Sequence, residues 1–254
     1  MKEEISKIHK NLSGEYLEAY LEIGSILLSD SNILCAILSG SILNGKQGKT
    51  SDLDIIAITK EDLYQRKQIS MSGIFIELFL YSKNELYQSF RENDYQNMNM
   101  VGNGFVMFDK INILNPIRKK ARYLFEKGPE KLNIEQKTYL QYWVWDSYCD
   151  VIDVVSVSSM SAFSLIHKNI WYALEVYYKL NSMWFCKPKR MLDEIKNINE
   201  DIYNNLVGIY SCSLKDIKKA VDYYRTIVKI VIHPHDIDKH FTWESRPRKS
   251  KLSK

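Results

Sequence analysis

The sequence predicts an α/β (α+β) fold in which a small mixed β-sheet with helices is followed by an all-α helical bundle. Strand-like runs rich in Ile, Leu and Phe stop at about residue 115 of the 254-residue chain, and long helical patterns fill the remainder. The low counts of Gly and Pro, 10 and 5, favour long regular elements with short connections. Together these observations indicate two domains that differ in secondary structure.

An amphipathic helix is expected first, over residues 3–28, because apolar residues recur there at three- and four-residue spacing, although Gly14 weakens its centre. Three strands rich in Ile, Leu or Phe should follow, at residues 33–38, 53–59 and 73–81. A helix is expected from about Asn84, and Gly104 to Asp109 reads as a short fourth strand. The sheet is therefore expected to be complete by residue 109.

The second half carries only helical patterns. Segment 127–134 contains Gly128 and Pro129 and interrupts the patterns on either side of it. We therefore predict a first domain at residues 1–126 and a helical domain at residues 127–254. The expected helices lie at residues 116–126, 135–158, 160–180, 188–207 and 214–232.

The composition limits the class of protein and its compartment. A formal net charge of +4 suits an enzyme that handles anionic ligands, but it is well below the charge of a dedicated DNA-binding protein. The chain begins without an apolar leader, and no stretch approaches 18 uncharged apolar residues, so we expect a cytoplasmic protein with no membrane span. Four cysteines lie in or beside apolar or aromatic runs without a CxxC pair, as small core residues do: Cys35, Cys149, Cys186 and Cys212.

The segment from Gly40 to Asp54 carries the main candidate functional residues. A buried strand ends at Ser39-Gly40-Ser41, where a backbone without a Cβ atom can approach a ligand closely. If a short helix opens there, its N–H groups and the Ser41 hydroxyl would face an incoming phosphate. Asp52 and Asp54 then begin the next strand, where side-chain alternation places both carboxylates on one face. Two such oxygen ligands suit Mg²⁺, which is normally held by one or two carboxylates together with substrate phosphates.

Glu77 is an isolated acid in the strand at residues 73–81, where its neighbours are apolar. A carboxylate in such a run is costly to bury unless a cation or another partner satisfies it. If this strand lies beside that of Asp52 and Asp54, Glu77 completes a cluster of three carboxylates, and bound metal ions would keep all three ionised. The alternative is a structural pairing of Glu77 with a Lys or Arg.

These residues resemble the motif of the polymerase-β-like nucleotidyltransferases, which have a glycine–serine after the first strand, a spacer, Asp-x-Asp, and a third acid on a later strand. The matching positions are Gly40-Ser41, Asp52, Asp54 and Glu77. The similarity extends weakly to Gly104–Asp109 and to Trp184–Arg190, and it departs at Asn44, where many relatives have Arg. The best match is to small bacterial enzymes with a C-terminal helical domain, a group that includes the aminoglycoside nucleotidyltransferases.

The resemblance implies nucleotidyl transfer assisted by two Mg²⁺ ions, or by Mn²⁺, at Asp52, Asp54 and Glu77. The phosphates of an NTP would bind to the Ser39–Ser41 segment. A nucleoside monophosphate, with AMP expected, would move to an acceptor hydroxyl while pyrophosphate leaves. The general base would be Glu77 or an acid of the helical domain, and the active site is expected in a cleft between the two domains.

The acceptor is less well determined than the chemistry. A small molecule such as an aminoglycoside-type antibiotic is our first expectation, because the helical half is compact and could close a small pocket. The alternatives are a tRNA or protein acceptor, which the basic segment 245–254 favours, and a non-catalytic nucleotide- or partner-binding module that keeps the fold. The oligomeric state stays open, and a homodimer is one of the options.

Two groups of residues in the helical half are further candidates. Asp146, Asp150 and Asp153 fall at i, i+4 and i+7 on the expected helix 135–158. They form either a solvated acidic face or a stripe that binds a cationic acceptor or supplies the general base. Lys187 and Lys189 are either surface lysines or point charges that reach the triphosphate.

Overall fold

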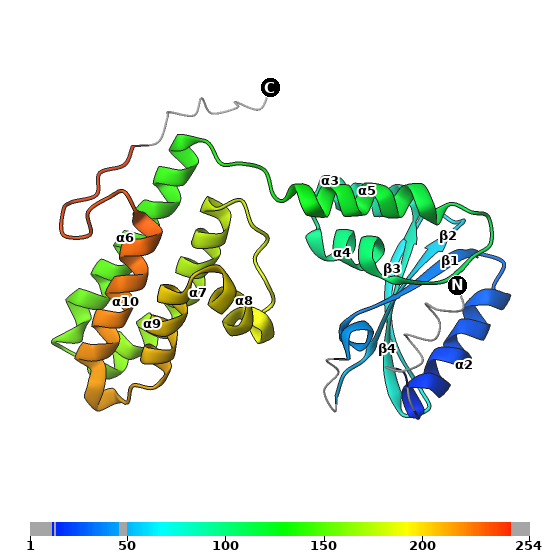
Figure 1. Ribbon diagram of the computed structural model, residues 1–254, viewed down its shortest axis with the longest axis horizontal. Coiled ribbons are helices and arrows are strands. Elements are labelled where there is room, and N and C mark those ends of the chain that lie inside the picture. The colour runs from blue at the N-terminus through cyan, green and yellow to red at the C-terminus, as the bar shows by residue number, and fades with distance from the viewer. Residues whose placement is uncertain (1–11, 13, 46–49, 245–254) are drawn as a thin grey trace, which may run out of the picture. The chain divides into compact units, whose positions relative to one another are not determined.

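The computed structural model of the chain describes residues 12, 14–45 and 50–244. The chain forms two compact units, Met1–Gly128 and Pro129–Lys254. The first contains a β-sheet with helices, and the regular elements of the second are all helices within its described residues, 129–244 (Figure 1). An α+β fold with a sheet followed by a helical region was predicted, and the structure confirms it. The break between the units falls two residues beyond the boundary that we placed after residue 126.

The first unit is built on a five-stranded mixed sheet with the strand order β3-β4-β2-β1-β5. The central pair, β2 and β4, is parallel, whereas β1–β2, β1–β5 and β3–β4 are antiparallel. The strands are β1 (Ile33–Ser39), β2 (Leu53–Thr59), β3 (Tyr64–Met71), β4 (Ile74–Ser82) and β5 (Phe105–Asp109).

One face of this sheet packs against helix α2 (Glu15–Ser29). Strand alternation explains which residues form the contact, because every second residue of β2 and β4 joins the same buried cluster as Ala19 and Ile23 of α2. The residues of β2 and β4 in this cluster are Leu53, Ile55, Ala57, Ile74, Ile76, Leu78 and Leu80. The intervening residues, which include Asp54 and Glu77, therefore lie on the opposite face.

Helix α2 begins later than the sequence pattern suggested. It starts at Glu15, and Gly14 is its N-cap, with φ of 54° and ψ of −132°. A residue in that conformation cannot continue an α-helix, so the expected helix over residues 3–28 is wrong in having Gly14 within it. Residues 3–11 of the expected helix lie outside the described residues.

Strand β3 was not expected from the sequence. Its residues are largely polar, and all but two of them are exposed, because β3 is an edge strand. A two-residue turn, Ser72-Gly73, joins it to β4. An edge strand needs no continuous apolar face, so the usual alternation of apolar and polar residues is weak here.

Two short helices stand where one helix was expected from about Asn84. The segment after Asn84 divides into α3 (Lys83–Arg91) and α4 (Tyr95–Asn103), and α5 (Leu114–Lys127) follows β5. The break has a local cause, because the Asp94 side chain accepts a hydrogen bond from the Asn97 N–H and caps α4. Helix α4 packs against β1 and α5, and α3 packs against β4.

The second unit is a helical bundle whose core is lined mainly by Ile, Val, Ala and Tyr. Its helices are α6 (Ile134–Val155), α7 (Ser159–Leu180), α8 (Met191–Ile198), α9 (Glu200–Tyr210) and α10 (Ile217–Ile232), with the short 3₁₀ helices η2 (Pro188–Arg190) and η3 (Leu214–Asp216). The single helix expected at 188–207 is wrong, because Asn199 caps α9 by accepting the Ile202 N–H and so separates α8 from α9.

The four cysteines are free thiols in the structure. Cys35 and Cys186 are buried, and burial raises the pKa of Cys35 to about 12 and that of Cys186 to about 11. Both are therefore neutral at physiological pH, as core residues should be. No helix within the described residues has the length and hydropathy that crossing a bilayer requires.

The packing of β5 against β1 predicts a clear difference between two glycine substitutions. A Cβ atom at Gly104 would lie 2.3 Å from the Met100 carbonyl oxygen and 2.8 Å from the Leu38 carbonyl oxygen. Gly104→Ala should therefore destabilise the first unit, by on the order of 3 kcal/mol. Gly24→Ala in α2 meets only the Met107 Cε atom, at 3.5 Å, and should stabilise the unit by about 0.5–1 kcal/mol.

Urea denaturation followed by circular dichroism measures both effects. Equal midpoints for the two variants would contradict the close approach of β1, α4 and β5 at Gly104.

Candidate metal and nucleotide site

Three carboxylates meet on the face of the sheet opposite α2. Asp52 directly precedes β2, Asp54 lies within it, and Glu77 lies on β4. The parallel pairing of β2 with β4 places Asp54 directly beside Glu77, so both side chains leave the same face. One ligand oxygen from each of the three carboxylates lies within 4.8 Å of the others, and all three residues are half-buried. The juxtaposition expected from the sequence is the one that the structure has.

The donor set fits a hard divalent cation. All three ligands are carboxylate oxygens, which Mg²⁺ and Mn²⁺ prefer, whereas zinc sites are dominated by Cys and His. Partial burial lowers the effective dielectric, which strengthens the attraction of such a cluster for a cation. Among the described residues, this is the one group of three or more Asp, Glu, His or Cys side chains close enough together to hold a metal ion.

Gly40 lies against the carboxylate of Asp54. It has φ of 86° and ψ of −168°, a region that is almost restricted to glycine. A Cβ atom at this position would lie 2.1 Å from Oδ2 of Asp54. Ser39, the preceding residue, pairs with Asp54 across the β1–β2 ladder. The end of β1 is thus held against a candidate metal ligand, and only glycine fits at position 40.

The short helix expected after Gly40 is present as the 3₁₀ helix η1 (Ser41–Asn44). Ser41 Oγ donates a long hydrogen bond of 3.4 Å to Ser51 Oγ. This bond joins the start of η1 to the residue just before Asp52. The Tyr16 hydroxyl of α2 donates to the Ser51 carbonyl oxygen at 2.8 Å and fixes the same residue. Residues 46–49, between these points, lie outside the described residues. Contact of Ser39, Gly40 and Ser41 with a phosphate stays a prediction.

Arg66 of β3 is a member of this site that the sequence did not reveal. Its Nε atom donates to Oε1 of Glu77 at 2.7 Å, and its Nη2 atom donates to the same oxygen. The hydrogen bonds and the negative charge of Glu77 raise the pKa of the Arg66 guanidinium. The side chains are 59% and 20% exposed, respectively. The pairing of Glu77 with a basic residue, which was the structural alternative, therefore occurs within the carboxylate cluster itself.

One sequence signal could have located Arg66. The Ser72-Gly73 dipeptide just before the strand of Glu77 is a turn signal, and it indicates a hairpin with the preceding residues. Counting back from that turn pairs Gln68 with Glu77 and Arg66 with Phe79. The basic residue is then one pair diagonal to the acid on the same face, which is within reach of a long side chain.

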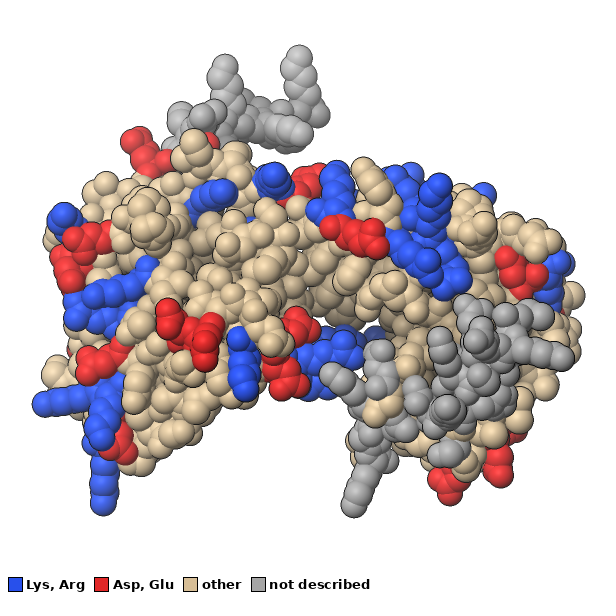
Figure 2. All heavy atoms as spheres, in the orientation of Figure 1, with Lys and Arg blue, Asp and Glu red and all other residues tan. Residues whose placement is uncertain are grey.

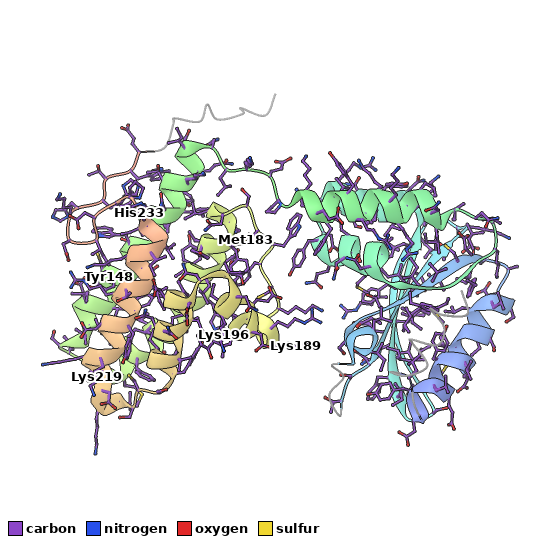
Figure 3. All side chains as sticks on the ribbon, in the orientation of Figure 1. Tyr148, Met183, Lys189, Lys196, Lys219 and His233 are labelled. Carbon is purple, nitrogen blue, oxygen red and sulfur yellow. The ribbon has the colours of Figure 1, made fainter. Side chains whose placement is uncertain are left out.

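The candidate residues of the helical half belong to the second unit. Asp146 is half-buried and Asp150 and Asp153 are exposed on α6. Lys187 and Lys189 are exposed on either side of Pro188, and Lys189 is in the segment that leads into α8 (Figure 3). On the face of this unit shown in Figure 2, acidic and basic side chains are interspersed. The roles of these residues in nucleotide and acceptor binding stay predictions.

Comparison with known proteins gives a distant similarity in structure. No protein-family model matches the sequence, and no curated protein matches it. Among solved structures, the chain is similar to a nucleotidyltransferase-like protein from Exiguobacterium sibiricum 255-15, with a TM-score of 0.49 and 14% sequence identity. The match covers 84% of this chain and 74% of that one. At this level of similarity, we infer function from the carboxylate site alone.

The contact between Gly40 and Asp54 predicts the effect of an added methyl group. Gly40→Ala should displace the Asp54 carboxylate and weaken Mn²⁺ binding at least about tenfold, because a misplaced ligand loses much of its interaction with the cation. The backbone strain should also cost about 1–3 kcal/mol of stability. Isothermal titration calorimetry measures the affinity, and thermal unfolding measures the stability.

Gly14→Ala provides the matched control. Gly14 also has a positive φ, of 54°, but a Cβ atom there would have no neighbour within 4 Å. It should show a similar loss of stability with unchanged Mn²⁺ affinity. Equal Mn²⁺ affinities in the two variants would contradict the placement of Gly40 against Asp54.

Proposed function

We propose that this protein is a metal-dependent nucleotidyltransferase that moves a nucleoside monophosphate, AMP in the first instance, from an NTP to a hydroxyl group of an acceptor. The observation that carries the proposal is the cluster of Asp52, Asp54 and Glu77, with ligand oxygens within 4.8 Å of one another. Gly40, held against Asp54, adds a turn where a phosphate chain can approach the backbone. Nucleotidyl transfer depends mainly on positioning and charge neutralisation, which such a site supplies.

In this proposal the residues of the first unit bind and orient the nucleotide. Asp52, Asp54 and Glu77 hold the divalent cations, and the Ser39–Ser41 segment contacts the phosphates. Bound Mg²⁺ or Mn²⁺ supplies neutralisation of the charge on the attacking and leaving oxygens. The acceptor oxygen forms a bond to the α-phosphorus, the bond from that phosphorus to the bridging oxygen breaks, and pyrophosphate leaves with the electron pair. The acceptor proton passes to a carboxylate.

The base that receives this proton is either Glu77 or an acid of the helical unit. Glu77 is also a proposed metal ligand, so fewer of its lone pairs would be available for an acceptor proton when a cation is bound. Asp146 and Asp150 on α6 are not proposed metal ligands, so their carboxylates suit a general base or a contact to a cationic acceptor. The pH profiles of Glu77→Gln and Asp146→Asn distinguish the two assignments.

We propose a small molecule as the acceptor, and an aminoglycoside-type compound is the first to test. The acidic stripe of α6 supports this choice, because an aminoglycoside is a polycation and carboxylates attract it. The second choice is a tRNA or protein acceptor, which the basic residues of segment 245–254 favour. Transfer of label from NTP to a panel of aminoglycosides, tRNA and lysate proteins separates the two. A module that binds nucleotide without catalysis would bind Mg²⁺-NTP and label none of them.

The carboxylate cluster predicts the behaviour of conservative variants. Asp52→Asn and Asp54→Asn should each lower the transfer rate by at least about a thousandfold, because each removes a ligand charge where the transition state needs it. The thermal transition should change little, since both residues are half-buried and already near other acids. Release of labelled pyrophosphate measures the rate, and differential scanning calorimetry measures the transition.

Glu61→Gln is the control for these variants. Glu61 is exposed and lies just beyond the other end of β2, so the loss of its charge should leave the rate unchanged. Transfer that survives either aspartate substitution would remove the proposed function.

The helical unit should affect the acceptor and the nucleotide separately. Asp146→Asn and Asp150→Asn should raise KM for a cationic acceptor about threefold to tenfold, because each removes one attractive charge. They should leave KM for the NTP unchanged. Lys187→Gln and Lys189→Gln should instead raise KM for the NTP and leave KM for the acceptor unchanged. Steady-state kinetics with both substrates varied measures the effects, and Asp222→Asn on α10 is an exposed acidic control.

A further inference from the structure

Arg66 reaches the carboxylate cluster from the edge of the sheet. In the β3–β4 ladder, Gln68 is opposite Glu77 and Arg66 is opposite Phe79. Directly paired residues project to the same face, so Arg66 and Glu77 share the face that carries the three carboxylates. The guanidinium carbon lies over the Phe79 ring, 5.2 Å from its centre, in a cation–π contact.

The Arg66 guanidinium forms hydrogen bonds to one carboxylate oxygen of the cluster. Both Nε and Nη2 of Arg66 donate to Oε1 of Glu77, and that carboxylate also belongs to the group with ligand atoms within 4.8 Å. The negative charge of Asp54 contributes to the raised pKa of Arg66, so the cation interacts with more of the cluster than its direct partner. A single positive charge thus offsets part of the repulsion among three carboxylates.

We propose that Arg66 is a displaceable counter-ion: it neutralises Glu77 in the metal-free protein, yields Glu77 to the divalent cation, and then pairs with a phosphate of the bound nucleotide. The proposal rests on the proposed function, because it takes the cation and the NTP from it. It makes Arg66 a residue of nucleotide binding as well as of the metal-free state.

The exposure of Arg66 makes its release inexpensive. The Arg66 side chain is 59% exposed, against 20% for Glu77, so the released guanidinium returns to water, and a pair open to solvent on one side contributes little to stability. A divalent cation held by three carboxylates interacts more strongly with Glu77 than one guanidinium does. Arg66 cannot lose its proton at physiological pH, so the released guanidinium stays cationic, and its planar fork matches a phosphate. It remains tethered to β3, one diagonal pair from Glu77.

Arg66→Gln tests the exchange because it should change two binding affinities in opposite directions. Without nucleotide, the variant should bind Mn²⁺ about threefold to tenfold more tightly than the wild type, because a competing and repelling positive charge is gone. With saturating Mg²⁺, it should bind a non-hydrolysable NTP about tenfold more weakly, because a phosphate contact is gone. Isothermal titration calorimetry measures both constants on the full-length protein.

Lys67→Gln is the matched control. Lys67 is the next residue on β3 and is also exposed, but it pairs with Leu78 and projects to the other face of the sheet. The Lys67→Gln substitution also removes one positive charge from β3, but on the face away from the carboxylates. Both binding constants should therefore stay at the wild-type values. Arg66→Lys keeps the charge without the fork, and should restore Mn²⁺ affinity to the wild-type value but NTP affinity only in part.

The outcomes separate this inference from the proposed function. Tighter Mn²⁺ binding together with weaker NTP binding in Arg66→Gln alone supports the exchange. Weaker binding of both ligands would show that Arg66 only positions Glu77, and unchanged binding of either ligand would show that the exchange does not occur. Both results overturn the inference and leave the proposed function standing. A wild-type protein that binds neither Mn²⁺ nor NTP overturns both.

Discussion

The site depends on the parallel pairing of β2 with β4. The hairpin formed by β3 and β4 returns β4 between β2 and the edge strand, so Asp54 and Glu77 become direct neighbours although 22 positions separate them in the sequence. A shift of one residue in this register would turn Glu77 into the α2-facing core and a leucine or isoleucine outward. The apolar residues on the α2 face resist that shift, because they would lose their buried environment. Burial on one face of the sheet therefore fixes the chemistry on the other.

The sequence predicted the strands of the sheet where burial controls composition. The limits expected for β2 coincide with those observed, and β1 and β4 differ by one residue at their ends. The same reasoning located Glu77, because an acid among apolar residues requires a partner. It failed for β3, whose exposed residues are under no such constraint. It also failed at Gly14, whose backbone conformation starts a helix, and at Asn199, whose side chain caps α9 and so divides the expected helix.

The candidate site shows the same division. Asp52, Asp54 and Glu77 could be grouped in advance because spacing and alternation are properties of single strands and of their neighbours. Arg66 was missed, because its role comes from a diagonal contact across a hairpin that the Ser72-Gly73 turn signals but the polar composition of β3 does not. The two halves of the chain also differ in what they reveal. The candidate acids of the first unit meet at one cluster, whereas those of the second unit are spread along α6 and the candidate lysines flank Pro188.

The contact between Gly40 and Asp54 makes two ligands interdependent. The backbone at the end of β1 leaves no room for even a methyl group against Oδ2 of Asp54, so a movement of either group is transmitted to the other. If phosphates bind to the Ser39–Ser41 segment and cations bind to Asp54, the binding of either one changes the positions of the residues that bind the other. Thermodynamic linkage then requires the effect to be reciprocal: whatever factor the cation contributes to nucleotide affinity, the nucleotide contributes to cation affinity. A glycine without a side chain would in this way couple occupancy at the two halves of one site.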